Sequence, residues 1–572
     1  MKQGAQRKDE RLILNIPENF TEWWKNSWGF LALLALLVFI TYVNSLPNGF
    51  VSDDVTAIRD NPGINKTSLF WSPPILSPNS LILFIVHKFF GPDPAIYRGV
   101  NILFHLGYSW VIYFLLGLLF RPPTAFFAAA LFAVHPILSE SVTWISGGNY
   151  TQYGLFMLVS FLFYILSERK KKYYYLSLAS FFVALLFTER AFIFPLILLS
   201  WELARGRLLC NWKKTVPFFL LGGLKVIPSL LSINKRFENL TTEYALKSRI
   251  ENPLLQIPIA VSVYLQLIFY PTGFTFFHSK TAYTYFEYGW RSAVLMLYLG
   301  MLVYAYFSRR RMAFFWLCYF IIPLLPTLTP LRVASHIAER YVSAGVLGIF
   351  VLVALGLAKL SRMKRLKPAV YAGFALLLLG LSIRTMIRNT DWKDEHTLWA
   401  QTLKVSPNSV NAHNNLCASY VQKGEMDKAI QEATTAINLM PTYAHPYNNL
   451  AIIYVRMGRY QEAKEAYLKA VSLNPNLWQS YRGLGEIAFE QGNYAVSRDY
   501  FLKVIELLPQ DAEMRYNLGV VYLKLNDKAN ALEELQKALE LNPQHEKARQ
   551  ILELIQKDQQ SNPVILKGQA EK

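Results

Sequence analysis

Two adjacent aspartates occupy a polar loop that follows the first long apolar stretch of the sequence. Asp53 and Asp54 stand a few residues beyond Leu46, where that stretch ends. Neighbouring carboxylates at a membrane surface can share a site in which one of them stays basic enough to take a proton from an incoming hydroxyl. The same pair can also be two solvated charges, so the polar groups around it must decide. We predict that Asp53 is the base and Asp54 its helper.

Further charged residues stand at the edges of later apolar stretches. A charge in or beside a membrane costs about 2.5–3.5 kcal/mol on insertion scales, so it is usually paired or functional. We predict that Arg340, Arg190 and His336 bind a phosphate, because a guanidinium fork suits phosphate oxygens. The alternative is that Arg340 is only a structural partner of Glu339 or Glu189. The residues expected to support the site are His135, Glu140, Trp144, Glu189, Glu339 and Tyr341.

Two polar residues lie inside an apolar stretch. Asn101 and His105 are four residues apart and therefore share one side of a helix. They are as well suited to hydrogen bonds between helices as to a binding site. Cys210, Cys318 and Cys417 are far apart and lack the spacing of metal or redox motifs, so no metal ligands are predicted and metal dependence stays open.

The composition of the chain indicates a membrane protein. Of the 572 residues, 53% are hydrophobic and 17% are charged, which is too apolar for a soluble protein of two or three domains. A spanning helix needs about 20 apolar residues, and fewer where it is buried in protein. The sequence predicts about eleven spans, near residues 28–46, 95–119, 122–136, 149–167, 173–188, 191–204, 214–232, 288–307, 312–329, 340–359 and 368–388.

Lys and Arg near the ends of the predicted spans set the orientation. The basic excess behind the net charge of +19 lies before residue 391, in short runs such as 169–172 and 362–367. Such runs mark cytoplasmic loops and contact anionic lipids, so no nucleic acid partner is expected. A cytoplasmic tail at 1–27 and eleven crossings place the C-terminus outside the cytoplasm. We expect 252–270 to be interfacial or re-entrant; if it spans, the C-terminal part is cytoplasmic.

Prolines recur every 34 residues in the C-terminal part, which is the period of the tetratricopeptide repeat (TPR). Gly424, Gly458 and Gly492 keep the same spacing, and Asn526 takes the fourth place, where a left-handed residue must end a helix. The sequence predicts a TPR solenoid with a polar capping helix at 544–558. Its four repeats are 408–441, 442–475, 476–509 and 510–543.

Asparagines recur just before the repeat leucine, at Asn415, Asn449 and Asn517, with Gly483 breaking the series. Side-chain amides both donate and accept hydrogen bonds, so such a row can hold an extended peptide whatever its sequence. We predict that these residues bind an acceptor protein or peptide in the TPR groove. Asparagine is also common at this position in TPRs, so the alternative is a plain docking platform.

Several short motifs occur together in one order along the chain. The combination resembles the transmembrane and TPR-containing O-mannosyltransferases, which belong to the GT-C superfamily of glycosyltransferases. The resemblance covers residues 28 to about 560. The motifs are the Asp53-Asp54 loop, His135-Pro-Ile-x-x-Glu140, Trp144-Ile-Ser-Gly, Glu189, Asn252-Pro, Ala338-Glu-Arg-Tyr341 and Trp392-x-Asp394-Glu395-x-Thr-Leu-Trp399.

The resemblance implies an all-α chain with a cytoplasmic tail (1–27), a polytopic GT-C-like membrane domain (28–390) and a TPR domain (391–572). It implies inverting transfer of a sugar from a polyprenyl-phosphate donor to a hydroxyl of a protein or glycan outside the cytoplasm. Asp53 would deprotonate the acceptor and basic residues would hold the lipid phosphate. No further cofactor is implied.

The chain departs from the family pattern at two motifs, and its repeat array is short. Thr188 precedes Glu189 where the family has Lys, and Val-Ser-Ala-Gly follows Tyr341. These departures leave the sugar and the acceptor open. Alternative functions are a non-catalytic TPR scaffold for envelope proteins and another ligase or polymerase of lipid-linked glycans. We expect a bacterial inner membrane with the TPRs outside; the alternative is the endoplasmic reticulum with lumenal TPRs.

Overall fold

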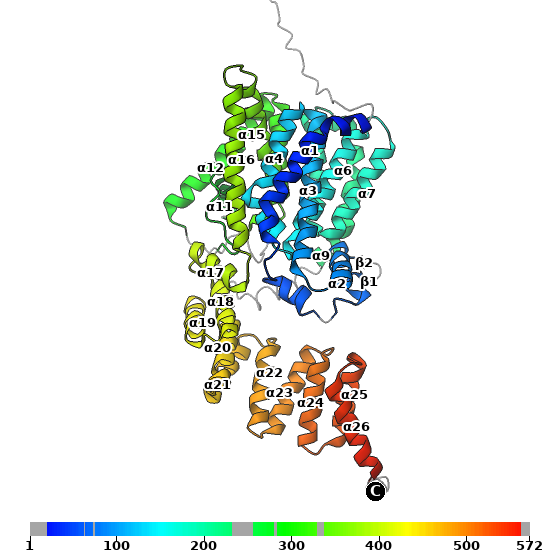
Figure 1. Cartoon of the computed structure of the whole chain (residues 1–572), viewed down its shortest axis with the longest axis vertical. Coiled ribbons are helices and arrows are strands. Elements are labelled where there is room, and N and C mark those ends of the chain that lie inside the picture. The colour runs from blue at the N-terminus through cyan, green and yellow to red at the C-terminus, as the bar shows by residue number, and fades with distance from the viewer. Residues whose placement is uncertain are drawn as a thin grey trace, which may run out of the picture. The chain divides into compact units, whose positions relative to one another are not determined.

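The computed structural model describes residues 20–61, 63–72, 75–231, 256–278, 283–328 and 337–561 (Figure 1). The chain divides into two compact units, and the second unit begins its helical array at Val410. Both units are helical, as predicted, apart from a small antiparallel hairpin of β1 (Trp71–Ser72) and β2 (Ile75–Leu76). Residues 391–409 belong to the first unit, so the division falls later than the predicted boundary at 390.

The first unit consists of helices joined by short turns. The longer helices are α1 (Phe20–Tyr42), α2 (Pro78–Phe90), α3 (Pro94–Leu119), α4 (Pro122–Val134), α6 (Asn149–Leu166), α7 (Lys172–Phe187), α8 (Phe194–Ala204), α9 (Leu208–Leu231), α11 (Gln256–Phe269), α12 (Tyr285–Phe307), α13 (Arg311–Ile321), α15 (Val346–Ser361), α16 (Lys367–Thr390) and α17 (Glu395–Val405). The short helical turns are η1 (Val43–Ser45), η2 (Val55–Arg59), η3 (Thr67–Leu69), η4 (Pro136–Leu138), α5 (Ser139–Thr143), η5 (Ser146–Gly148), η6 (Glu189–Ile193), η8 (Ile322–Leu324) and α14 (Glu339–Val342).

The predicted count of eleven spans is not confirmed. Within the described residues, four helices are long and apolar enough to cross a membrane: Ser27–Ser45, Pro94–Leu119, Tyr285–Phe307 and Lys367–Thr390. A fifth is counted if the bent pair Pro122–Val134 and Pro136–Thr143 acts as one span. The other predicted spans form helices that do not reach this length and hydropathy. The sequence predicts that the segment 252–270 is interfacial or re-entrant rather than a span, and its helix α11, with 14 residues, is about 21 Å long, shorter than a ~30 Å hydrocarbon core.

A bend of 54° separates α4 from the helical turns that follow it. Pro136 causes the break, because the residue before a proline avoids the helical region and His135 is accordingly extended. Helix α15 packs along α4 and α13, and it approaches α13 so closely that a Cβ on Gly348 would lie 2.3 Å from the carbonyl oxygen of Trp316.

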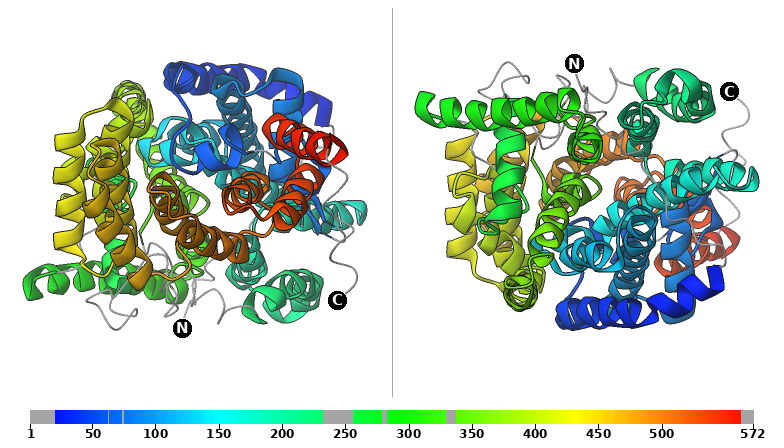
Figure 2. Two further views of the ribbon diagram at one scale, coloured as in Figure 1. Left: turned by 90° about the horizontal axis from the view of Figure 1, so that it is seen from below. Right: turned by 90° about the horizontal axis from the view of Figure 1, so that it is seen from above.

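The second unit is a stack of helix pairs that follows the 34-residue period. Gly424, Gly458, Gly492 and Asn526 all have positive φ between the helices of a pair, which is the conformation that the spacing predicts. Viewed from below, successive pairs stack from yellow to red (Figure 2). The pairs are α18 (Val410–Lys423) with α19 (Met426–Leu439), α20 (Ala444–Arg456) with α21 (Tyr460–Leu473), α22 (Trp478–Glu490) with α23 (Tyr494–Leu507), and α24 (Ala512–Lys524) with α25 (Lys528–Leu541), followed by α26 (Glu546–Ser561).

Candidate active site

The loop that carries the aspartate pair is fastened to the C-terminal end of the first unit. The backbone N–H of Gly49 donates to the carbonyl of Lys393 over 2.8 Å, and the Asn48 amide donates to the carbonyl of Asn389 over 2.8 Å. Arg98, fully buried on α3, donates to the carbonyls of Asn48 and Gly49. Segments more than 300 residues apart in sequence therefore fix the start of the loop.

Ser52, the residue before the pair, has a left-handed backbone with φ of 55°. For a residue other than glycine this conformation costs about 1–3 kcal/mol, and it persists only where the surroundings impose it. The carboxylate of Glu395 imposes it here, since it accepts the N–H of Ser52 over 2.5 Å. The other oxygen of Glu395 accepts the indole N–H of Trp399. Strain held in this way is a frequent mark of functional loops.

The structure separates the two aspartates. Asp53 is exposed, whereas Asp54 is fully buried. Asp54 accepts the backbone N–H of Ser146 over 2.8 Å and the Ser146 hydroxyl over 2.5 Å, so it ties the loop to η5. Burial raises the pKa of Asp54 to about 6, although these hydrogen bonds and Arg98 lower it.

Asp53 has the electrostatic surroundings of a general base. Desolvation by the neighbouring chain raises its pKa above the ordinary value, and the positive charge of Arg340 lowers it. The helper role of Asp54 stays a prediction. Asp53 is thus an exposed carboxylate that feels the positive charge of Arg340.

Arg340 pairs with Glu140, which is a different partner from the two considered in the sequence. Its guanidinium donates to one oxygen of Glu140 and its backbone N–H donates to the other over 2.9 Å. Glu140 is fully buried, while the Arg340 side chain stays 13% exposed. The guanidinium carbon lies 5.5 Å from the ring centre of Trp144 and 5.0 Å from that of Tyr341. Glu140 and the two rings therefore fix the position of the Arg340 guanidinium.

Arg190, like Arg340, lies beside the ring of Tyr341. Its guanidinium carbon is 4.2 Å from the ring centre of Tyr341 and 5.4 Å from that of Tyr150. Thr188 accepts the Arg190 backbone N–H over 3.4 Å and thereby caps η6, the turn that begins at Glu189. Two predicted phosphate-binding arginines thus share one tyrosine, which brings two positive charges to the same region of the site.

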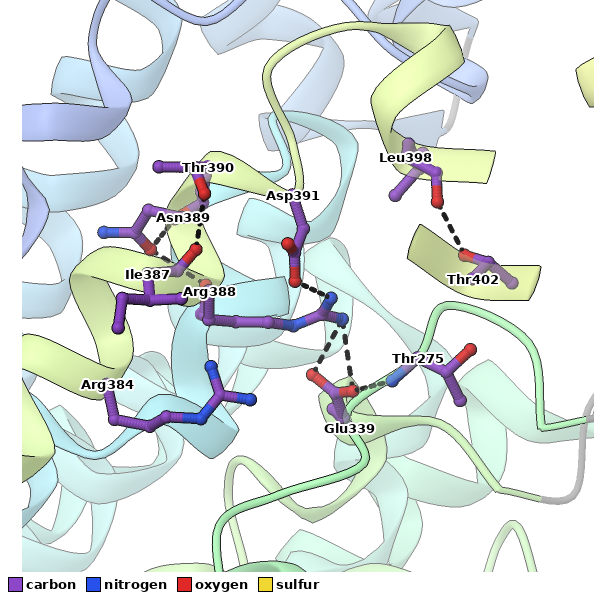
Figure 3. Close-up of polar contacts among 12 residues, drawn as sticks. Thr275, Glu339, Arg384, Ile387, Arg388, Asn389, Thr390, Asp391, Leu398 and Thr402 are labelled. Carbon is purple, nitrogen blue, oxygen red and sulfur yellow. Dashed lines mark hydrogen bonds and ion pairs between the residues drawn. The ribbon is translucent and has the colours of Figure 1, made fainter. Parts of the chain in front are cut away.

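A buried ionic network lies beneath these groups and was not predicted (Figure 3). The Arg388 guanidinium donates to both oxygens of Glu339, over 3.2 and 3.3 Å, and to Asp391 over 2.8 Å. Glu339 also accepts the backbone N–H of Thr275 over 2.8 Å. A charge that is buried without such partners would cost several kcal/mol, so these contacts fix α14, α16 and the 271–278 segment against each other. Arg384, one turn earlier on α16, donates to the carbonyl of Pro271 over 3.0 Å.

An aromatic cluster adjoins the site. Phe276 makes edge contacts with Trp144, Trp392 and Trp399, with ring centres 5.2–5.5 Å apart. Trp144 and Trp392 are stacked at 6.0 Å. These rings join the end of α5, the 271–278 segment and α17, so the Trp392-to-Trp399 motif anchors α17 to the rest of the first unit.

Other predicted site residues have structural contacts. Asn101 donates to the carbonyls of Trp144 and Ile145, and His105 contacts the carbonyl of Ala133 over 3.1 Å. His135 contacts the carbonyl of Ile268 and accepts the N–H of Ile137. All three residues are buried and join helices, which is the alternative that the sequence left open for Asn101 and His105. His336 lies outside the described residues.

In the TPR unit, Asn415, Asn449 and Asn517 are each half-buried. The Asn449 amide donates to the side chain of Asn414 over 2.9 Å, so it links two neighbouring repeats. Part of the predicted peptide-binding row is thus used between repeats. Their role in binding an acceptor stays a prediction.

Among the residues that the structure describes, no group of three or more His, Cys, Asp or Glu is placed to hold a metal ion. The polar groups that converge are instead a carboxylate, two guanidiniums and aromatic rings. This combination can accept a proton and bind an anionic leaving group at the same place.

Sequence reasoning missed Arg98, Arg388 and Glu395. The first two carried a usable signal, because an arginine inside a predicted span is rarely without a role. Glu395 was noted only as part of a motif. Its carboxylate could not be linked to Ser52 from the sequence, since 343 residues separate them.

Two parts of the chain match known families. Residues 76–231 match the family described as dolichyl-phosphate-mannose-protein mannosyltransferase. Residues 408–476, 448–512 and 512–545 match tetratricopeptide repeat families. The resemblance drawn from the sequence is confirmed.

Individual relatives combine the same two parts. The chain is 26% identical over 477 residues to protein O-mannosyl-transferase TMTC3 of Homo sapiens, covering 72% of this chain and 51% of the relative. It is 24% identical over 478 residues to protein O-mannosyl-transferase TMTC4 of Homo sapiens, covering 68% and 64%. The chain thus spans about half to two thirds of the length of these relatives. Among solved structures, the crystal structure of MamA protein covers 27% of this chain at 24% identity with a TM-score of 0.24.

Proposed function

We propose that the chain is a membrane glycosyltransferase that moves a sugar from a polyprenyl-phosphate donor to a hydroxyl of a protein outside the cytoplasm. The observation that carries the proposal is that the Asp53 loop and Arg340 meet at one place. Asp54 of the loop bonds Ser146, and the Arg340 guanidinium, held by the buried Glu140, lies 5.5 Å from the ring centre of Trp144. The family match and the names of the relatives support a mannosyltransferase. Mannose is therefore the first sugar to test.

The proposed reaction is a direct displacement. Asp53 takes the proton of the acceptor hydroxyl, whose oxygen attacks the anomeric carbon of the sugar from the face opposite the phosphate. The bond between the anomeric carbon and the phosphate oxygen breaks, and the lipid phosphate leaves with its electron pair. Arg340 and Arg190 stabilise the negative charge that develops on the leaving phosphate. The sugar is thereby transferred with inversion.

The supporting groups have separate tasks in this scheme. Glu140 orients Arg340, and Asp54 holds the loop to Ser146 so that Asp53 stays in place. The TPR groove is proposed to bind the acceptor protein, with Asn415, Asn449 and Asn517 contacting its backbone. The relatives come from animals, so the expected bacterial inner membrane finds no support in them, whereas a non-cytoplasmic site fits either membrane.

The decisive experiment measures transfer of radiolabelled mannose from dolichyl-phosphate-mannose in membranes that contain the full chain. Asp53→Asn keeps the size of the side chain and removes the base, so transfer should fall by about two to four powers of ten. Asp60→Asn is the matched control, since Asp60 is an exposed carboxylate of the same loop that pairs with Arg59. Wild-type transfer by Asp53→Asn would refute the assignment, and no transfer by the wild type with any lipid-linked sugar would favour a scaffold.

Replacing Arg340 tests the phosphate site. Arg340→Lys keeps the charge and the backbone hydrogen bond to Glu140, but it removes the guanidinium fork that bonds Glu140 with one nitrogen and leaves others for a phosphate. Use of the donor should weaken at least tenfold, seen as a raised KM for the lipid, while the protein still folds. An unchanged KM would reassign Arg340 to a structural role.

A further inference from the structure

A cavity of about 350 Å³ lies at the end of the first unit remote from the candidate active site. It is formed where α3 ends, α4 begins and α15 ends. Three basic residues, Arg121, Lys359 and Arg362, line it together with Thr124. The rest of its lining is apolar and comes from the ends of α3 and α15.

The helices themselves separate this cavity from the active site. Arg121 precedes α4 and Glu140 follows it, and the 13 residues of α4 span about 20 Å. Arg340 precedes α15 and Arg362 follows it, and the 16 residues of α15 span about 24 Å. Because α15 packs along α4, the cavity and the Glu140–Arg340 pair lie at opposite ends of the same helices. A ligand of the cavity is therefore not the sugar donor.

The charge around the cavity is uncompensated. Arg121, Lys359 and Arg362 are exposed, and none of them forms an ion pair with a carboxylate in the described structure. No acidic residue lines the cavity. Three converging cations with a hydroxyl match the oxygens of a phosphate group.

The surroundings of the cavity distinguish a lipid from a soluble anion. Large apolar side chains at the end of α15 and in the turn after it, Leu360, Met363 and Leu366, are exposed. Half of the lining residues are apolar as well. The glycerol and acyl chains of a lipid would contact them, whereas a free phosphate would not. Basic pockets between membrane helices bind anionic headgroups by this combination.

We propose that this cavity binds the phosphate headgroup of an anionic membrane lipid and holds the ends of α3, α4 and α15 together at that surface. The general preference for basic residues in cytoplasmic loops accounts for their number but not for their convergence on a hollow. Lys364 and Arg365 belong to the same basic run but do not line the cavity. Replacing them therefore distinguishes a headgroup site from a general effect of basic residues in the loop.

The test uses the purified full chain and native mass spectrometry in mixed micelles of dioleoylphosphatidylglycerol and dioleoylphosphatidylcholine. The wild type should retain phosphatidylglycerol in preference to phosphatidylcholine. Arg121→Gln with Arg362→Gln should weaken that retention about 30-fold, from two lost cation contacts. Lys364→Gln with Arg365→Gln removes the same charge and should retain the lipid as the wild type does.

Three results would overturn the proposal. Equal losses in the two double variants would show a diffuse charge effect, and equal retention of both lipids would show no headgroup site. Displacement of phosphatidylglycerol by inorganic phosphate or glycerol 3-phosphate at equal concentration would assign the cavity to a soluble anion. None of these readouts depends on sugar transfer.

Discussion

Replacing Glu395 with Gln should impair transfer, although both oxygens of the Glu395 carboxylate bond other residues of the protein rather than a substrate. In the structure one carboxylate oxygen accepts the N–H of Ser52 and the other accepts the indole N–H of Trp399. A Gln side chain has one acceptor oxygen and one NH₂ group, so one of these two donors must face another donor. The substitution therefore breaks one charge-assisted hydrogen bond while keeping the shape of the side chain.

The size of the effect follows from the strain at Ser52. A hydrogen bond to a charged group contributes about 1.5–3 kcal/mol, and the left-handed backbone of Ser52 costs about 1–3 kcal/mol. Without Glu395 these two terms no longer balance, and the loop leaves the conformation that places Asp53. We expect the rate of transfer to fall about 10- to 100-fold. Ser52→Gly in the Glu395→Gln background should recover part of the loss, because glycine adopts positive φ without strain.

The assay is mannose transfer under donor saturation, combined with hydrogen exchange of the amides in residues 48–56. Glu395→Gln should lower kcat, leave the KM for the donor nearly unchanged and speed exchange in the loop. Asp394→Asn is the control, since Asp394 accepts the backbone N–H of Thr397 at the start of α17 and asparagine caps a helix in the same way. Wild-type kcat in Glu395→Gln, or a loss matched by a general fall in unfolding temperature, would refute the reasoning.

Further outcomes concern the ionic network, the buried aspartate and the orientation of the chain. Arg388→Met leaves Glu339 buried without its cation and should destabilise the protein by about 3–5 kcal/mol, whereas adding Glu339→Gln should restore most of the unfolding temperature; a single variant as stable as the wild type would contradict the pairing. Because burial raises the pKa of Asp54 from 3.8 to about 6, the folded chain binds a proton there more tightly than the unfolded chain. Its contribution to stability, up to about 3 kcal/mol, is complete below pH 3.8 and lost as the pH rises through 6, so the difference in unfolding temperature between wild type and Asp54→Asn should change between pH 4 and 7 and stay constant above. A protease added on the cytoplasmic side should not cleave residues 400–560, and cleavage there would place the TPR array in the cytoplasm.

The division into an apolar part and a repeat part, and the boundaries of the repeats, follow from the sequence because they depend on local properties. The 34-residue period alone located the helix pairs, since each repeat needs the same left-handed residue, as Gly424 and Asn526 show. Apolar composition and the Asp53 loop likewise indicated a membrane part with chemistry at one face. The number of spans did not follow, because some predicted spans form helices too short to cross a membrane on their own, such as the 11-residue α8 within 191–204.

The sequence by itself determined which residues carry charge at the membrane edge and that a TPR solenoid follows the membrane part. Only the tertiary structure decided which charges meet. It paired Arg340 with Glu140, 200 residues away, and Glu339 with Arg388. It also separated Asp53 from Asp54, because burial and hydrogen bonds depend on packing rather than on adjacency in the chain. An ion pair forms where two helices bring opposite charges together out of water, and that geometry is set by the whole bundle.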